Sequence, residues 1–220
     1  MLKWFRGNSG QTTAEGGREA RPRSKRHSTA LKELNRNLAR EENISILDLG
    51  ATSAANISLF TGKGMKLCTE DLIAASGDPE LQIKDPDGNP TYDLERFLKD
   101  NLAYELRSFD AVLFWDIADY LPEPLVKPVI ERICSLMKPG GYLLAFFHTK
   151  DAGPDSPYSR YHITGDDALD VQPIARKGSG GYYKLLRVFN NRHIENLFRD
   201  FSSLKFFLAR DNMREVLIVR

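Results

Sequence analysis

A short turn that contains a glycine is the segment of the chain best suited to hold a small ligand. The apolar run 44–49 (ISILDL) ends at Gly50, and the small residues 51–54 (ATSA) follow it. A glycine between a strand and a helix lets backbone N–H groups approach a ligand closely. Glu70 and Asp71 follow about 20 residues later, where an acid can accept hydrogen bonds from both hydroxyls of a ribose. The two segments together predict a nucleoside site.

The turn alone leaves other interpretations open. The dinucleotide pattern G-x-G-x-x-G would need glycine at positions 52 and 55, where the chain has Thr52 and Ala55. A simple strand-to-helix turn without a ligand is one alternative. A nucleotide-dependent oxidoreductase is another.

Few side chains are placed to act as acids or bases. His148 directly follows the apolar run 142–147 (YLLAFF), so we expect it at the ligand-binding edge of a sheet, as a general base. An ordinary histidine in a pocket wall is the alternative. His162, with Tyr158 and Tyr161, suggests a cap over a substrate or a group of surface aromatics. Zinc-ligand spacing and the phosphate-binding loop are missing, so no metal is expected.

The segments around these residues alternate between strand and helix patterns. The predicted strands are 44–49, 65–69, 109–115, 142–147, 204–210 and 213–219, and the predicted helices are 28–38, 52–60, 124–137 and 192–201. Such alternation favours a doubly wound, mostly parallel sheet between two layers of helices. The last two strands flank Asp211-Asn212, which predicts an antiparallel hairpin. Residues 72–108 form a long excursion, with a third strand or a short helix at 94–102.

Four segments resemble the class I S-adenosylmethionine-dependent methyltransferases. They are ILDLG at 46–50, the acid pair at 70–71, FDAVLFWDIADYLPEP at 109–124 and LMKPGGYLLAFFH at 136–148. The resemblance covers residues 44–150 and the closing hairpin, and its last two segments are the more specific. It implies a Rossmann-like three-layer α/β/α fold, S-adenosylmethionine as cofactor and direct in-line methyl transfer. The family more often has glycine at the positions of Thr52 and Ala54.

The resemblance also implies roles for individual positions. The residues that would face the methionine end of the cofactor are Asp48, Gly50, Ala51 and Thr52. Asp71, or Glu70 if the strand ends one residue earlier, would hold the ribose. Those near the adenine would be Asp100, Asn101 and Leu102, and those lining the pocket after the fourth strand would be Trp115, Asp116 and Ile117.

Positive charge is concentrated at the start of the chain. Seven Lys and Arg stand against two Glu in residues 1–30, although the whole chain has 31 basic and 30 acidic residues. We interpret residues 1–27 as a mobile basic arm and 28–220 as a methyltransferase-like domain, with 150–183 as a substrate cap. The arm suggests a weak contact with anionic surfaces. A solvated tail without a partner is the alternative.

Composition narrows the function further. The chain has 220 residues and is 41% hydrophobic, in the range of a globular domain, and we find neither a membrane-spanning run nor a secretory signal. We therefore expect a cytoplasmic protein. Because the folded part is acidic, we expect a small-molecule acceptor and no specific nucleic-acid partner. A non-catalytic methyltransferase-like binding or scaffolding domain is the alternative, and the pattern does not indicate an oligomeric state.

Overall fold

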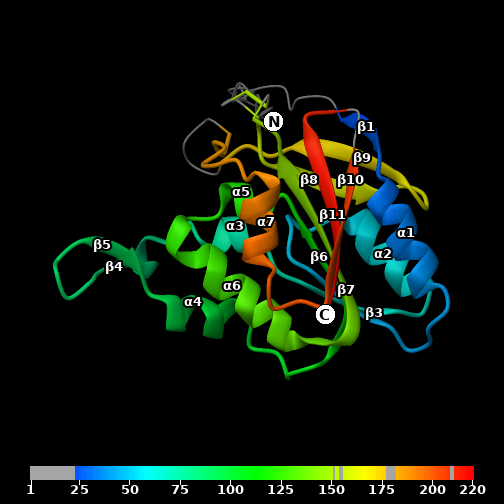
Figure 1. Cartoon of the computed structure of the whole chain (residues 1–220), viewed down its shortest axis with the longest axis horizontal. Coiled ribbons are helices and arrows are strands. Elements are labelled where there is room, and N and C mark those ends of the chain that lie inside the picture. The colour runs from blue at the N-terminus through cyan, green and yellow to red at the C-terminus, as the bar shows by residue number, and fades with distance from the viewer. Residues whose placement is uncertain (1–22, 151, 154–155, 177–181, 209–210) are drawn as a thin grey trace, which may run out of the picture.

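A six-stranded mixed sheet forms the centre of the molecule. The computed structural model describes residues 23–220 except 151, 154–155, 177–181 and 209–210 (Figure 1). The strands lie in the order β10-β11-β7-β6-β2-β3. Their bounds are β2 Ser45–Asp48, β3 Lys66–Thr69, β6 Phe109–Trp115, β7 Met137–His148, β10 Ser203–Leu208 and β11 Met213–Val219. Strands β3, β2, β6 and β7 are parallel, and β11 and β10 add the antiparallel hairpin.

Helices cover both faces of this sheet (Figure 1). Helices α1 (Thr29–Leu38) and α2 (Ala54–Gly62) lie on one side, and α4 (Leu94–Asn101), α6 (Glu123–Leu136) and α7 (Asn191–Leu197) lie on the other. Two short helices, α3 (Leu72–Ala75) and α5 (Ile117–Tyr120), follow β3 and β6. This arrangement confirms the predicted Rossmann-like fold class with its C-terminal antiparallel hairpin.

Strand β6 shows why the apolar runs predict the sheet so well. Its side chains alternate between two hydrophobic clusters, with Leu113 and Trp115 on the α1 side and Val112 and Phe114 on the α6 side. A strand buried on both faces needs apolar residues at every position, because successive side chains point to opposite faces. Such a run therefore identifies a central strand of a parallel sheet.

The excursion between β3 and β6 contains short helices and a small hairpin. Of the two predicted forms for residues 94–102, the structure has the helix, α4. A short 3-10 helix, Pro79–Leu81, precedes a two-stranded hairpin of β4 (Gln82–Lys84) and β5 (Pro90–Tyr92), which projects away from the body (Figure 1). The Asp85 carboxylate accepts backbone N–H bonds from Asp87 and Asn89 in its turn.

A second, three-stranded antiparallel sheet corrects one expectation about the N-terminal arm. Strand β1 (Ser24–His27) pairs with β9 (Ala168–Pro173), which pairs with β8 (Ser159–Ile163). The arm was predicted to extend to residue 27, but residues 24–27 are ordered because β9 supplies their backbone partners. Residues 1–22 lie outside the described part of the chain. The segment 150–183 contributes β8 and β9, and its role as a cap stays a prediction.

None of the helices in the described ranges is both long and apolar enough to cross a membrane.

Candidate functional site

The carboxylate of Asp48 holds the turn after β2 together. It is 2% exposed and accepts hydrogen bonds from Gly50 N (3.3 Å), Trp115 Nε1 (2.7 Å) and Asn56 Nδ2 (3.0 Å). Burial raises the pKa of Asp48 to about 6, although the bonds from Asn56, Trp115 and Gly50 oppose the shift. With three donors around it, this carboxylate acts as an anchor for the turn.

Aromatic side chains fill the space above the same turn. A Cβ on Gly50 would lie 2.5 Å from Cδ1 of Trp115, so only glycine lets the indole pack there. The hydroxyl of Tyr158 accepts a hydrogen bond from Ala51 N at 3.0 Å. Trp115 and Tyr158 are both almost fully buried, whereas Thr52 is exposed. The loop predicted to face the methionine end of a cofactor is thus closed by protein groups.

The acid pair lies at the carboxyl end of β3, next to this turn. Asp48 pairs with Thr69 across the two parallel strands, and Glu70 N donates to Asp48 O at 2.9 Å. Glu70 accepts a hydrogen bond from Tyr104 at 2.5 Å, and Asp71 caps α3 through Ala74 N at 3.0 Å. Both acids are half-buried. The structure therefore brings the acids to the predicted edge, and their role stays a prediction.

The three residues predicted near the adenine lie on α4 or at its end. Asp100 is exposed and 3.5 Å from Arg96, and Asn101 donates to the carbonyl of Phe97 in its own helix. Leu102 is fully buried in the core. The residue of this segment that reaches the acid pair is Tyr104, which sequence reasoning missed. No local pattern could have shown its contact with Glu70, 34 positions earlier.

A second group of polar side chains lies at the ends of β6 and β7. Asp116 follows β6, is 1% exposed and accepts a hydrogen bond at Oδ2 from the hydroxyl of Tyr161 (2.9 Å). Asp119 in α5 is fully buried, and its Oδ2 lies 2.7 Å from the backbone N and 2.9 Å from Nδ1 of His148. Ile117, between the two acids, is buried in the core. Sequence reasoning identified Asp116 and His148 but missed Asp119 and the bond from Tyr161.

Burial and neighbouring charges shift the pKa values of this group upward. Burial raises the pKa of Asp116 to about 7, and Asp119 adds to the rise while His148 and Tyr161 oppose it. Burial alone would lower the pKa of His148, but the hydrogen bond to Asp119 and the charges of Asp116 and Asp119 outweigh it and raise that pKa. Asp116 and His148 thus both titrate above their ordinary ranges.

A cavity of about 380 Å³ adjoins these residues. We call it the His148 cavity, and its polar and charged lining includes Lys25, Arg26, Asp116, His148, Tyr161 and Asp211. Tyr161 also stacks on Trp115, with ring centroids 4.9 Å apart and planes at 12°. The cavity therefore begins directly beside the aromatic group that closes the β2 turn.

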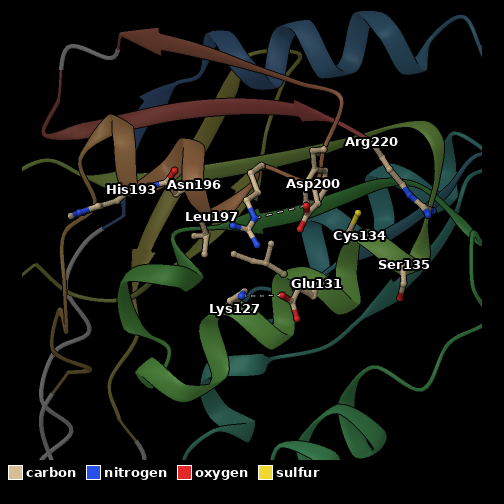
Figure 2. A pocket seen from close by; sticks show the side chains of 12 residues that line it. Lys127, Glu131, Cys134, Ser135, His193, Asn196, Leu197, Asp200 and Arg220 are labelled. Carbon is tan, nitrogen blue, oxygen red and sulfur yellow. Dashed lines mark ion pairs between the residues drawn. The ribbon is translucent and has the colours of Figure 1, made fainter.

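A larger cavity of about 510 Å³ lies elsewhere, between α6 and α7 (Figure 2). Its lining includes the ion pairs Lys127–Glu131 and Arg199–Asp200 and the thiol of Cys134 (Figure 2). It shares no residue with the ends of β2, β3, β6 or β7. We therefore place the candidate site at the strand ends and not in this cavity.

Comparisons with known proteins bear on the fold and the family of the chain. No curated protein matches the sequence. Among solved structures, the PH0226 protein from Pyrococcus horikoshii OT3 is 13% identical with a TM-score of 0.50, and the match covers 86% of this chain and 88% of that one. This likeness shows the fold.

Two further structures are similar at lower TM-scores. A SAM-dependent methyltransferase from Archaeoglobus fulgidus is 12% identical (TM-score 0.48; 86% of this chain, 94% of that one). The Burkholderia thailandensis 1,6-didemethyltoxoflavin-N1-methyltransferase, solved with S-adenosylhomocysteine, is 13% identical (TM-score 0.45; 88% and 79%).

A family model for a methyltransferase domain matches residues 23–202, most of the described chain. That range contains β2, β3, β6 and β7 and the residues of the candidate site named above except Asp211. The chain therefore belongs to the class I S-adenosylmethionine-dependent methyltransferases, enzymes whose cofactor is S-adenosylmethionine.

Proposed function

We propose that the chain methylates a small molecule that binds in the His148 cavity. The observation that carries this proposal is the buried His148–Asp119 pair, whose histidine lines a cavity beside the end of β6. A histidine held by a carboxylate is suited to take a proton from an acceptor.

The two ends of the cofactor site differ in how well they fit the cofactor. At the ribose end, Glu70 and Asp71 are half-buried acids at the edge of β3, and such carboxylates suit the two ribose hydroxyls. At the methionine end, Trp115 lies against Gly50 and Tyr158 holds Ala51 N. In this conformation that end does not fit the cofactor, and Tyr158 must leave Ala51 before it can.

The contribution of this chain at the acceptor is to hold and move a proton. S-adenosylmethionine supplies an activated methyl group when it is bound. The backbone N–H of His148 donates to Asp119 Oδ2, so that oxygen is an acceptor, and the Nδ1 atom that shares it carries hydrogen. Nε2 of His148 is then the basic nitrogen, on a side chain that lines the cavity. Asp119 acts as a positioning residue for this base.

Binding and turnover of His148 variants test the proposal together. We expect one molecule of S-adenosylhomocysteine to bind the wild-type chain in calorimetry. We expect His148→Gln to bind it equally well but to form product from S-adenosylmethionine and a panel of small acceptors at least about tenfold more slowly. The matched control is His193→Gln, an exposed position on α7, which should keep the wild-type rate.

Two results would contradict the proposal. If the wild-type chain does not bind S-adenosylhomocysteine, the domain is a non-catalytic methyltransferase-like module. If His148→Gln turns over at the wild-type rate, His148 is an ordinary residue of the cavity wall. For the positioning role, Asp119→Asn should shift the pH at which the rate reaches half its maximum, whereas a purely structural role would leave that pH unchanged.

A further inference from the structure

Four acids lie in or directly behind the wall of the His148 cavity. Asp116 and Asp211 line it, and two further carboxylates stand directly behind its wall, Asp119 against His148 and Glu215 against Arg26. The cations that face these four acids are Arg26, His148, the exposed side chain of Lys25 and Arg187, whose charge acts on Asp119. Arg26 pairs with Asp211 and Glu215, and His148 pairs with Asp119, so among the described residues Asp116 is the acid of these four without an ion pair.

The buried cation of the cavity, Arg26, is already matched by acids. Its side chain is 8% exposed, with Nε 2.7 Å from Asp211 and Nη2 2.8 Å from Glu215. Its guanidinium also lies over the ring of Phe146, 4.5 Å from the centroid. Its Nη1 has no partner in the described part of the chain and suits a neutral acceptor atom. Because two carboxylates already neutralise Arg26, the cavity is a poor site for an anion.

Asp116 has a hydrogen-bonding capacity that the protein does not use. Oδ2 accepts from Tyr161, but Oδ1 is buried and has no partner among the residues that the structure describes. A buried acceptor without a donor is costly, so a ligand that brings a donor is favoured. A positively charged donor gains more than a neutral one, because its charge also meets the carboxylate of Asp116, which has no ion pair among the described residues.

From these observations we infer that the His148 cavity binds a small-molecule amine and that Asp116 selects the amine over an alcohol or an acid. The ammonium group donates an N–H to Asp116. The proton that leaves the ammonium nitrogen passes to Nε2 of His148, which gives a neutral amine with a free lone pair and an imidazolium held by Asp119. Val171 and Met213, which also line the cavity, suit the carbon part of the ligand.

This inference deepens the proposed function, because the amine would be the methyl acceptor. Its test needs no turnover. The probes are benzylamine, benzyl alcohol and benzoate, which share one ring and differ in the polar group. In titrations of the full chain followed by nuclear magnetic resonance, we expect benzylamine to bind at least tenfold more tightly than benzyl alcohol, and benzoate not to bind. Equal binding of the alcohol, tighter binding of benzoate, or no binding of benzylamine would overturn the inference.

A charge-neutral variant assigns the selectivity to Asp116. Asp116→Asn keeps the size of the side chain, and we expect it to lower the preference for benzylamine over benzyl alcohol to less than threefold. The matched control is Asp200→Asn, which removes an acid from the cavity between α6 and α7 and should keep the wild-type preference. An unchanged preference in folded Asp116→Asn would overturn the role of Asp116. Circular dichroism checks folding, and the ranking of the three probes on the wild-type chain decides the inference if the variant does not fold.

The two proposals fail in different ways. Benzylamine selectivity without S-adenosylhomocysteine binding would support the amine cavity and contradict methyl transfer. Binding of S-adenosylhomocysteine without amine selectivity would support the cofactor site and contradict the amine cavity.

Discussion

The ends of β2 and β6 lie side by side in one sheet, yet the buried aspartates at these ends differ in how many hydrogen-bond donors the protein gives them. Asp48, at the end of β2, receives three donors, and aromatic side chains close the turn above it. Asp116, just after β6, receives one donor from another side chain and adjoins a cavity. A buried carboxylate that the protein satisfies holds its loop in place, and one that it leaves partly unsatisfied is prepared for a ligand. The comparison separates a structural acid from a binding acid.

The largest expected effect is the difference in stability lost when each of the two aspartates is replaced by alanine. Asp48→Ala leaves buried donors on Gly50, Trp115 and Asn56 without an acceptor, and we expect a loss of about 4 kcal/mol in the free energy of unfolding. Asp116→Ala removes the acceptor of Tyr161 alone, for which we expect about 1 kcal/mol. Urea unfolding of both variants at one pH measures the difference. Equal losses would remove the distinction between the acids.

The pH dependence of stability tests the burial of both acids. Their folded pKa values, about 6 for Asp48 and about 7 for Asp116, lie above the ordinary value of 3.8. The folded chain therefore binds more protons than the unfolded chain between these values. The stabilisation is fully present below about pH 4 and is lost as the pH rises through 6 and 7. The raised pKa of His148 acts in the same direction.

We expect the free energy of unfolding to fall by roughly 4 kcal/mol between pH 5 and pH 8. Urea unfolding of the wild-type chain across this range measures the slope, and Asp116→Asn should reduce it. A stability that stays level or rises with pH over this range would show that the two carboxyl groups are not desolvated as described.

A smaller effect is expected for the closed turn. Tyr158→Phe removes the bond to Ala51 N, which is worth about 1 kcal/mol, so the open form becomes easier to reach and S-adenosylhomocysteine should bind about fivefold more tightly. The matched control is Tyr120→Phe, which removes a bond from Tyr120 to the carbonyl of Ser156 and leaves the turn intact. Calorimetry compares the two, and weaker binding by Tyr158→Phe would show that its hydroxyl supports the cofactor.

The smallest effect is expected at α4. Asp100 is exposed and pairs with Arg96, so Asp100→Asn should change the affinity for S-adenosylhomocysteine by less than twofold. A loss of fivefold or more in the same titration would show that Asp100 reaches the adenine when the cofactor is bound.

Local patterns were enough to predict the sheet and the residues at its edge. Apolar runs identify β2, β6 and β7 because these strands are buried on both faces, and the residues that directly follow a strand must lie at its carboxyl end. That reasoning predicted that Asp48, the acid pair, Asp116 and His148 lie at the same edge of the sheet. It needs no knowledge of tertiary contacts.

The remaining features depend on contacts between distant parts of the chain. Tyr158 reaches Ala51 across 107 positions, and Arg26 reaches Asp211 across 185. Strand β1 was predicted as part of a mobile arm, because the partner that orders it, β9, lies more than 140 positions away. No periodicity or local composition records such pairs, so the closed turn and the charge of the cavity could not be predicted.

The central claim is that the cofactor binds at the end of β3 and the acceptor at the end of β6. Calorimetry of S-adenosylhomocysteine binding to Asp71→Ala, Asp116→Asn and the wild-type chain tests it most directly. The account predicts that Asp71→Ala weakens binding by about 1–3 kcal/mol, through loss of charged hydrogen bonds to the ribose, and that Asp116→Asn stays within about twofold of wild type. Unchanged affinity in Asp71→Ala, or a larger loss in Asp116→Asn, would contradict it.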